Sequence, residues 1–393
     1  MVTAKKSAII YTVLLSLALL VPSLMIFTTD HKARSSWELR RLDTLPSISD
    51  MADDPKAGFK QFDGWMNDHV GFSFQAIRFR KRFLYKHLGV TGDKYIVRNK
   101  DGDLFLTSRF NDNKREMPFS WFDGNCRKSV TRHYTALYVK SLSASNKVLS
   151  RFGAKTIFTA VPTKSVLLTD KFPASTPREM VEHCQKIDAS FNGLMLAAEK
   201  IPDLNAYYPY DLFKERTASD PLFYPNSAYH WAGESNWAFV EDFATRENLA
   251  LSKTWPKGPC VPHKVRWDIG LLMGVSRVVD GCNRDVRELR LNRYEKYAYP
   301  LNEGAKFDSV NVFALTNPYA ANDKNAVMIS NSFGPLVREQ FASLFKTTYH
   351  MNLNTLNKRD LKLLLHESDI MDTDYVVIIV ADFHYPEFLS PIK

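Results

Sequence analysis

The sequence predicts a mixed α/β protein in which helices cover a central, mostly parallel sheet. Two apolar runs, 155–161 and 374–380, have the length of buried strands, and we expect the second at the centre of the sheet. The first run follows a helical pattern over 132–152, which Gly153 ends as a C-cap. A third run, Ala326–Ile329, leads through a short polar turn into a predicted helix. Helix, short turn and strand in succession are typical of layered α/β folds.

The other elements follow from hydrophobic periodicity and turn chemistry. Apolar residues at helical intervals predict helices over 59–88, 178–200, 232–247 and 336–344. The stretch 95–106 predicts a β-hairpin, because Asn99–Gly102 supplies turn residues. Lys164 follows the strand at 155–161, where it either faces the functional edge of the sheet or lies on the surface.

Composition is that of a globular protein with a sizeable core. The chain has 393 residues, 45% of them hydrophobic and 13% aromatic, which fits one large domain or one with a small appendage. The net charge of +9 is spread along the chain and is densest within 78–86. No nucleic-acid-binding module appears, so we expect no nucleic acid partner. In an exported protein this charge suits an anionic polysaccharide or lipid headgroups, and a solvated helix face is the alternative for 78–86.

The amino terminus differs from the rest of the chain. Lys5 and Lys6 precede Ala8–Thr28, twenty-one residues without a charge. At about 1.5 Å per residue, such a helix spans a bilayer core of roughly 30 Å. No Ala-x-Ala-like cleavage site is present, which favours a membrane anchor over 1–29 rather than a cleaved signal segment. A linker over 30–56 then precedes one exported domain, 57–393.

The chain has four cysteines, Cys126, Cys184, Cys260 and Cys282. An even number in an exported protein predicts disulfides, and the spacings do not match a zinc site. We therefore expect no metal. Cys260 and Cys282 flank one segment and are the preferred pair, with Cys126–Cys184 as a second; the other two pairings stay open.

Ser332 lies in the turn between the strand at 326–329 and the next helix, for which Pro335 suits the first turn. A serine there is held at the carboxyl edge of the sheet, where α/β folds place their chemistry. Nearby backbone N–H groups are candidate oxyanion donors, and the Asn331 side chain is another. The alternative interpretation is a Ser-Asn-Ser turn that caps the helix.

His230 is a candidate general base. It stands next to Trp231, after the loop residues Asn226 and Ser227 and before a helical pattern. A structural histidine is the alternative interpretation of this stretch taken alone.

The two stretches together resemble the SGNH-hydrolase-like domain of the AlgJ/AlgX-type alginate O-acetyltransferases. That family carries a Gly-Asp-Ser-Phe turn, which reads Ser-Asn-Ser-Phe at 330–333, and an Asp-x-His-Trp-Asn loop, which reads Ala-Tyr-His-Trp-Ala at 228–232. Both motif aspartates are replaced. The stretches 65–72 and 267–273 also resemble family segments, and the resemblance covers roughly 55–390.

The resemblance implies a three-layer SGNH-type sandwich and acyl transfer without a cofactor. Ser332 would be the nucleophile and His230 its base, with Asn331, Trp231 and Asn226 in supporting or oxyanion roles. The family's orienting aspartate corresponds to Ala228, which cannot orient the ring. Two alternatives for holding the ring stay open: a hydrogen bond from Asn226 or Ser227, which supplies no charge, or a carboxylate from elsewhere in the chain, such as Asp268 or Asp382.

Two functions of different class follow. The first is an exported O-acetyltransferase of an exopolysaccharide such as alginate, held by one span in a bacterial inner membrane with its main domain in the periplasm. The resemblance implies that a multispanning membrane acyltransferase hands over the acetyl group. The second is a catalytically degenerate member that binds polysaccharide or serves as a scaffold in the synthesis and export complex. An esterase that removes acetyl groups would use the same residues.

Overall fold

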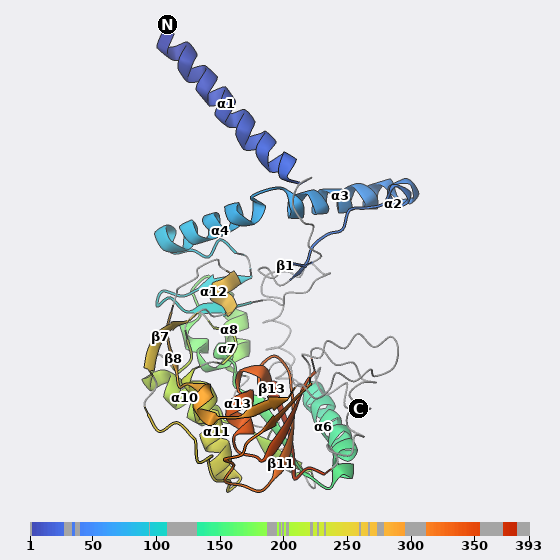
Figure 1. The fold of residues 1–393 in the computed structure, drawn as a ribbon, viewed down its shortest axis with the longest axis vertical. Helices are drawn as coiled ribbons and strands as arrows, with labels where there is room; N and C mark the ends of the chain where they lie inside the picture. The colour runs from blue at the N-terminus through green and yellow to red at the C-terminus, as the bar shows by residue number, and fades with distance from the viewer. Residues whose placement is uncertain are drawn as a thin grey trace. The chain divides into compact units, whose positions relative to one another are not determined.

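A computed structural model gives the structure of the protein (Figure 1). It describes the residues 2–26, 34–35, 40–93, 95–107, 132–186, 195, 198, 200–201, 204–220, 223–225, 228–231, 233–258, 261–265, 268–272, 279–294, 312–353 and 372–382. The chain divides into two compact units. The smaller unit comprises Met1–Val97, Ser108–Pro118 and Gly270–Ser276, and the larger comprises Arg98–Thr107, Phe119–Ile269 and Arg277–Lys393.

The larger unit contains a seven-stranded sheet, which confirms the predicted mixed α/β class with a mostly parallel sheet. Five neighbouring strands run parallel, and β10 and β9 follow at one edge, each through an antiparallel pairing. In sheet order they are β6 (Leu204–Tyr207), β5 (Lys155–Val161), β13 (Tyr375–Ala381), β11 (Asn325–Ser330), β12 (Thr347–Asn352), β10 (Val312–Thr316) and β9 (Asn292–Tyr294). The runs at 155–161 and 374–380 are therefore adjacent interior strands, as their apolar composition predicted.

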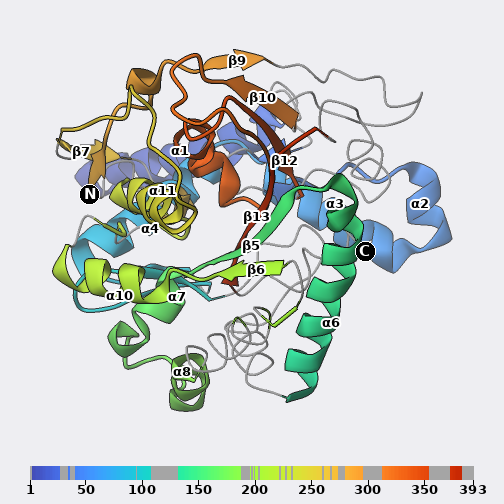
Figure 2. The same ribbon diagram turned by 90° about the horizontal axis from the view of Figure 1, so that it is seen from below.

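Helices cover both faces of this sheet. Figures 1 and 2 show α6 (Arg132–Leu149) on one face, and α11 (Glu234–Arg246) and α13 (Arg338–Ala342) on the other. The core beneath α6 joins Tyr138 of the helix to alternate residues of the strands, among them Phe158 and Ile378. On the opposite face, Phe341 of α13 contacts Phe243 of α11, with ring centroids 5.4 Å apart. The larger unit is thus a three-layer α/β arrangement.

Most of the helices predicted in this unit are present, but they begin or end at other residues than predicted. The pattern over 132–152 gives α6 and the 3-10 turn η2 (Ser150–Phe152), and Gly153 follows with a φ of 66°. The pattern over 178–200 gives α8 (Arg178–Gln185), and most of the remainder lies outside the described residues. The helix expected over 336–344 is shorter, because the 3-10 turn η6 (Gly334–Leu336) precedes α13.

Shorter elements complete the described chain. A two-stranded sheet of β3 (Ile96–Arg98) and β4 (Leu104–Leu106) confirms the hairpin predicted over 95–106. The others are α7 (Lys164–Leu167), η3 (Thr169–Lys171), α10 (Tyr210–Ser219), β7 (Val261–Val265), α12 (Asp268–Leu272), β8 (Val279–Asn283) and η4 (Val286–Leu289).

The smaller unit is largely helical. The pattern over 59–88 gives α3 (Pro55–His69), α4 (Ser73–Phe83) and the π-helix η1 (Leu84–Leu88), because the helix breaks at Phe72, whose φ is 64°. The unit also contains α1 (Val2–Met25), β1 (Arg34–Ser35), β2 (Arg40–Arg41) and α2 (Ile48–Asp53), the last within the predicted linker. The uncharged segment Ala8–Thr28 continues past the described end of this part of the chain.

Among the helices in the described residues, none has the length and apolar character needed to cross a membrane.

Candidate active site

Ser332 lies in the turn after β11, at the carboxyl edge of the parallel strands. The turn is held by three hydrogen bonds that start or end at Asn331. Its N–H donates to the Ile379 carbonyl at 3.3 Å, its side-chain oxygen accepts from the Phe333 N–H at 3.0 Å, and its carbonyl accepts from the Gly334 N–H at 3.1 Å. The strand, tight turn and helical turn predicted from the sequence therefore place Ser332 at the position expected of a nucleophile.

A chain of hydrogen bonds connects Ser332, His230 and Asp268. The Ser332 Oγ lies 2.8 Å from the His230 Nε2, and the His230 Nδ1 lies 2.5 Å from the Asp268 Oδ2. With the carboxylate accepting at Nδ1, the proton of a neutral ring resides there, and Nε2 accepts from the serine hydroxyl. The His230 and Asp268 side chains are 24% and 28% exposed, so solvent reaches the pair. This is the geometry of a serine, its base and the carboxylate that orients the base.

Asp268 is fixed by backbone donors as well as by the histidine ring. Its Oδ1 accepts from the N–H of Tyr229 at 2.8 Å and from the N–H of Ile269 at 3.0 Å. Burial acts to raise the pKa of this carboxyl, but the hydrogen bonds and the charge of His230 outweigh burial and hold the pKa below its usual value. The carboxylate is therefore ionised at neutral pH, as stabilisation of an imidazolium requires.

Of the two carboxylates that the sequence offered in place of Ala228, Asp268 reaches the histidine. Asp382 is buried elsewhere, and its Oδ2 accepts from the Thr163 N–H at 3.1 Å and the Tyr208 hydroxyl at 3.2 Å. Ala228 itself is fully buried. The sequence offered Asp268 and Asp382 on equal terms, and the resemblance of 267–273 to a Gly-Asp family segment did not distinguish between them.

Trp231 and Phe333 join the histidine loop to the serine turn. The Trp231 indole Nε1 donates to the Phe333 carbonyl at 2.7 Å, and the Phe333 ring packs against the His230 ring with centroids 4.7 Å apart. Asn236, at the start of α11, adds a 2.6 Å hydrogen bond to the Leu336 carbonyl. The Ser-Phe and His-Trp pairs therefore position each other, which gives Trp231 a structural role in the site.

The backbone N–H of Ser332 is a candidate oxyanion donor. It has no acceptor within the part of the chain that the structure describes, whereas the Phe333 N–H is taken by the Asn331 side chain. Because that side-chain oxygen holds the turn, any oxyanion role of Asn331 would fall to its amide nitrogen, and this role stays a prediction. Asn226 lies outside the described residues.

Lys164 is buried and supports the loop that carries His230. Its Nζ donates to the Pro225 carbonyl at 3.3 Å and lies 3.2 Å from the Asp103 Oδ1. Burial lowers the pKa of Lys164 to about 8, and the charge of Asp103 opposes the effect. In the same loop the Tyr224 hydroxyl donates to the Tyr229 carbonyl at 2.9 Å. Of the two interpretations of Lys164, the surface position is wrong.

A second serine–histidine pair lies close by, and it differs in being buried and in having, within the described part of the chain, no carboxylate at the other ring nitrogen. The Ser330 Oγ is 2.7 Å from the His350 Nε2, but both residues are buried. The His350 Nδ1 has no hydrogen-bond partner among the described residues, so no carboxylate orients this ring. Burial, with Arg338 and Arg293 nearby, lowers the pKa of His350 to about 3. This pair is part of the core.

The turn requires glycine at position 334, because a side chain there would overlap with Ser330. A Cβ at this position would lie 1.8 Å from the Ser330 Oγ, which its hydrogen bond to His350 holds in place. We expect Gly334→Ala to destabilise the fold by about 1–3 kcal/mol, as overpacking does, and to displace Ser332. Thermal unfolding together with the rate of Ser332 acylation measures both effects. Gly258→Ala is the matched control because nothing lies within 4 Å of its added Cβ, and equal behaviour of the two variants would contradict this prediction.

The cysteines and metals complete the predicted features. Cys184 on α8 is buried and disulfide-bonded. The candidate pair lies outside the described residues, since Cys260 is not described and of Cys282 only the backbone is, in β8. The described residues contain no cluster of three or more histidine, cysteine, aspartate or glutamate side chains able to hold a metal ion.

Comparison with known proteins finds similarity in structure alone. No family model matches the chain, and no curated protein matches it. It is similar to PatB1 of Bacillus cereus, at 13% identity over 74% of this chain and 96% of that one, with a TM-score of 0.46. It is also similar to a DHHW family protein of Eubacterium siraeum (11% identity, 64% and 88% covered, TM-score 0.44). A third similar structure is the O-acetyltransferase domain of Pseudomonas putida AlgJ (10% identity, 76% and 98% covered, TM-score 0.43).

Proposed function

We propose that the protein is an O-acetyltransferase that moves an acetyl group to a hydroxyl of an exopolysaccharide through an acetyl-Ser332 intermediate. The observation that carries the proposal is the hydrogen-bonded chain from Ser332 through His230 to Asp268. The SGNH-type assignment of the three-layer fold, and alginate as one candidate polymer, rest on the motif resemblance. So does the donor, an acetyl group delivered by a multispanning membrane acyltransferase.

The reaction consists of two acyl transfers, and the His230 Nε2 carries the proton in both. In the first, the Ser332 Oγ attacks the donor carbonyl while the His230 Nε2 takes the hydroxyl proton, and the Ser332 N–H stabilises the oxyanion. Collapse of the tetrahedral intermediate expels the leaving group, which takes the proton from Nε2. In the second, Nε2 removes the proton of the sugar hydroxyl as its oxygen attacks the acetyl ester, and Ser332 leaves with that proton. Asp268 stabilises the imidazolium at both stages.

The degenerate alternative rested on the two replaced motif aspartates, of which the one at position 228 would orient the histidine. Asp268 supplies a carboxylate at the His230 Nδ1, so Ala228 no longer argues against catalysis. Water could replace the sugar in the second transfer, which would make the enzyme an esterase. Tight positioning of an acceptor hydroxyl at Nε2 would favour transfer over hydrolysis.

Export and anchoring are proposed with the activity. The uncharged segment Ala8–Thr28, with Lys5 and Lys6 before it, favours one span in a bacterial inner membrane, with the catalytic unit in the periplasm. The disulfide of Cys184 supports an oxidising compartment.

The test is covalent labelling of the full chain in detergent with an activated acetyl ester, followed by intact-mass analysis. We expect one added acetyl group in the unmodified protein and in Ser330→Ala, and none in Ser332→Ala. Addition of exopolysaccharide oligomers should then remove the acetyl group and yield an acetylated oligomer. An acetyl group that persists in Ser332→Ala would overturn the assignment, and an unlabelled chain would favour the degenerate alternative.

A further inference from the structure

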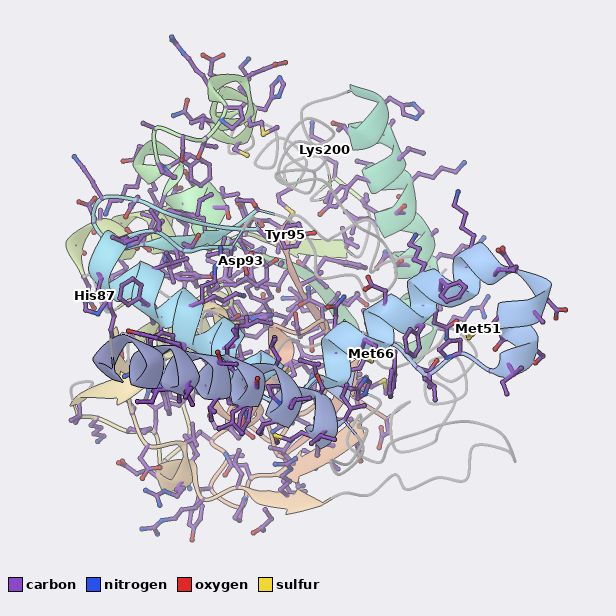
Figure 3. All side chains as sticks on the ribbon, turned by 90° about the horizontal axis from the view of Figure 1, so that it is seen from above. Met51, Met66, His87, Asp93, Tyr95 and Lys200 are labelled. Carbon is purple, nitrogen blue, oxygen red and sulfur yellow. The ribbon has the colours of Figure 1, made fainter. Side chains whose placement is uncertain are left out.

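The helix α4 and its continuation η1 present exposed aromatic side chains along one line. Phe79 and Phe83 are one turn apart, and their rings stack with centroids 6.3 Å apart although they are 72% and 47% exposed. His87 extends the line, with its ring 4.9 Å from that of Phe83. Figure 3 shows His87 in the last turn of this helical segment. We call Phe79, Phe83 and His87 the aromatic stripe.

Basic side chains border the aromatic stripe. At 100° per residue in α4, Arg82 and Arg78 lie along one border of it and Arg80 along the other. Lys86 follows in η1, next to His87. Arg78, Arg80, Arg82 and Lys86 are all exposed. The segment 71–92 contains no aspartate or glutamate. Lys81, on the opposite side of the helix, pairs with Asp93 at 2.7 Å.

This distribution of residues is that of a helix lying at a membrane surface. Such helices place aromatic and aliphatic side chains at the boundary between headgroups and acyl chains, while flanking lysine and arginine contact anionic headgroups. Long basic side chains reach the phosphates while their methylenes stay against apolar surface.

The position of α1 within the same unit agrees with this interpretation. The Gly71 N–H, just before α4, donates to the Pro22 carbonyl of α1 at 2.9 Å. A Cβ on Gly71 would lie 2.6 Å from the Met25 Cβ, so the two backbones approach closely. Figure 1 shows α4 starting beside the C-terminal end of α1 and running away from it. If the uncharged segment Ala8–Thr28 spans the bilayer, as proposed above, α4 begins at the membrane surface.

We propose that α4 and η1 lie in the plane of the bilayer, with the aromatic stripe in the headgroup–acyl boundary and the flanking basic residues on anionic phospholipid headgroups. The proposal rests on the membrane anchoring proposed above and is independent of acyl transfer. It adds a second membrane contact that selects lipid charge. Each basic residue at an anionic surface favours binding by about fivefold.

The test uses single tryptophan reporters in the full chain, reconstituted into vesicles of phosphatidylcholine with or without phosphatidylglycerol. Dibrominated lipids quench tryptophan near the headgroup–acyl boundary, and emission of the unsubstituted protein is subtracted. We expect quenching of Phe79→Trp at least about twofold stronger than that of Phe59→Trp. Phe59 is the matched position, because it lies on α3 of the same unit and is 62% exposed. Quenching at position 79 should require phosphatidylglycerol and fall in Arg78→Glu/Arg82→Glu, but not in Lys56→Glu/Lys60→Glu.

A third reporter, Leu15→Trp in α1, separates the two proposals. Quenching at position 15 with none at position 79 would overturn the in-plane helix and leave anchoring intact. Absence of quenching at both positions would overturn both. Emission at position 79 that is insensitive to lipid but changes with protein concentration would assign the aromatic stripe to contact with a second copy, and so would also overturn the proposal.

Discussion

Replacing His230 with alanine is expected to lower the turnover of acetyl transfer by about 10⁶-fold. The ring is the only group placed 2.8 Å from the Ser332 Oγ to take its proton, among the residues that the structure describes. The measurement is the initial rate with an activated acetyl ester, where the leaving group needs no protonation, and with an oligosaccharide acceptor. The loss should be larger with the acceptor, because both halves of that reaction pass a proton through Nε2.

His350 provides the matched control for this substitution. It makes the same hydrogen bond to a serine, at 2.7 Å, but belongs to the buried pair. His350→Asn should lower the midpoint of thermal unfolding and leave turnover of the folded fraction within about tenfold of the unsubstituted protein. Should His350→Asn abolish turnover while His230→Ala retains it, the assignment of the base would be wrong.

Replacing Asp268 with asparagine is expected to lower turnover by about 10⁴-fold with little change in KM. Asparagine keeps the shape and an oxygen for the N–H groups of Tyr229 and Ile269, but it removes the charge and can present an amide to the His230 Nδ1. The ring would then hold its proton at Nε2, where it cannot accept from Ser332. Steady-state kinetics at fixed pH, with unfolding midpoints for comparison, measure the effect.

Asp382→Asn is the control for a buried carboxylate outside the triad. Its oxygen also accepts from a backbone N–H and a hydroxyl, and asparagine can keep both bonds. We expect turnover within about tenfold of the unsubstituted protein. Turnover reduced equally in both asparagine variants would indicate a general effect of losing a buried charge, and Asp268 would lose its assigned role.

Local sequence patterns predicted the strands and the nucleophile turn because these depend on neighbouring residues. The run at 374–380 forms an interior strand since its apolar side chains require burial on both faces. Two of the three hydrogen bonds that hold the turn at Ser332 are local, from the N–H groups of Phe333 and Gly334 to Asn331. These are short-range causes, and a sequence displays them directly.

Contacts between residues far apart in the sequence determine the features that local sequence patterns did not predict. The helix predicted over 59–88 breaks at Phe72, next to the residue whose N–H bonds to Pro22 of a distant helix. Asp268 reaches His230 across 38 positions of sequence, so no spacing rule points to it. Hydrophobic periodicity reports which residues are buried, but it carries no information on which polar groups meet at the edge of a sheet.

Because the orienting carboxylate lies on α12, the loop that carries His230 does not also have to carry that carboxylate. At position 228 the side chain is fully buried, and a carboxylate there would have to be ionised in an apolar setting. Asp268 is partly exposed and bound by backbone N–H groups, so its charge is stabilised by donors other than the histidine. Position 228 of the histidine loop can therefore hold a small apolar side chain in the core. A survey that scores chains by the residue two positions before the histidine would class this chain as inactive, although its serine, histidine and aspartate are hydrogen-bonded in three dimensions.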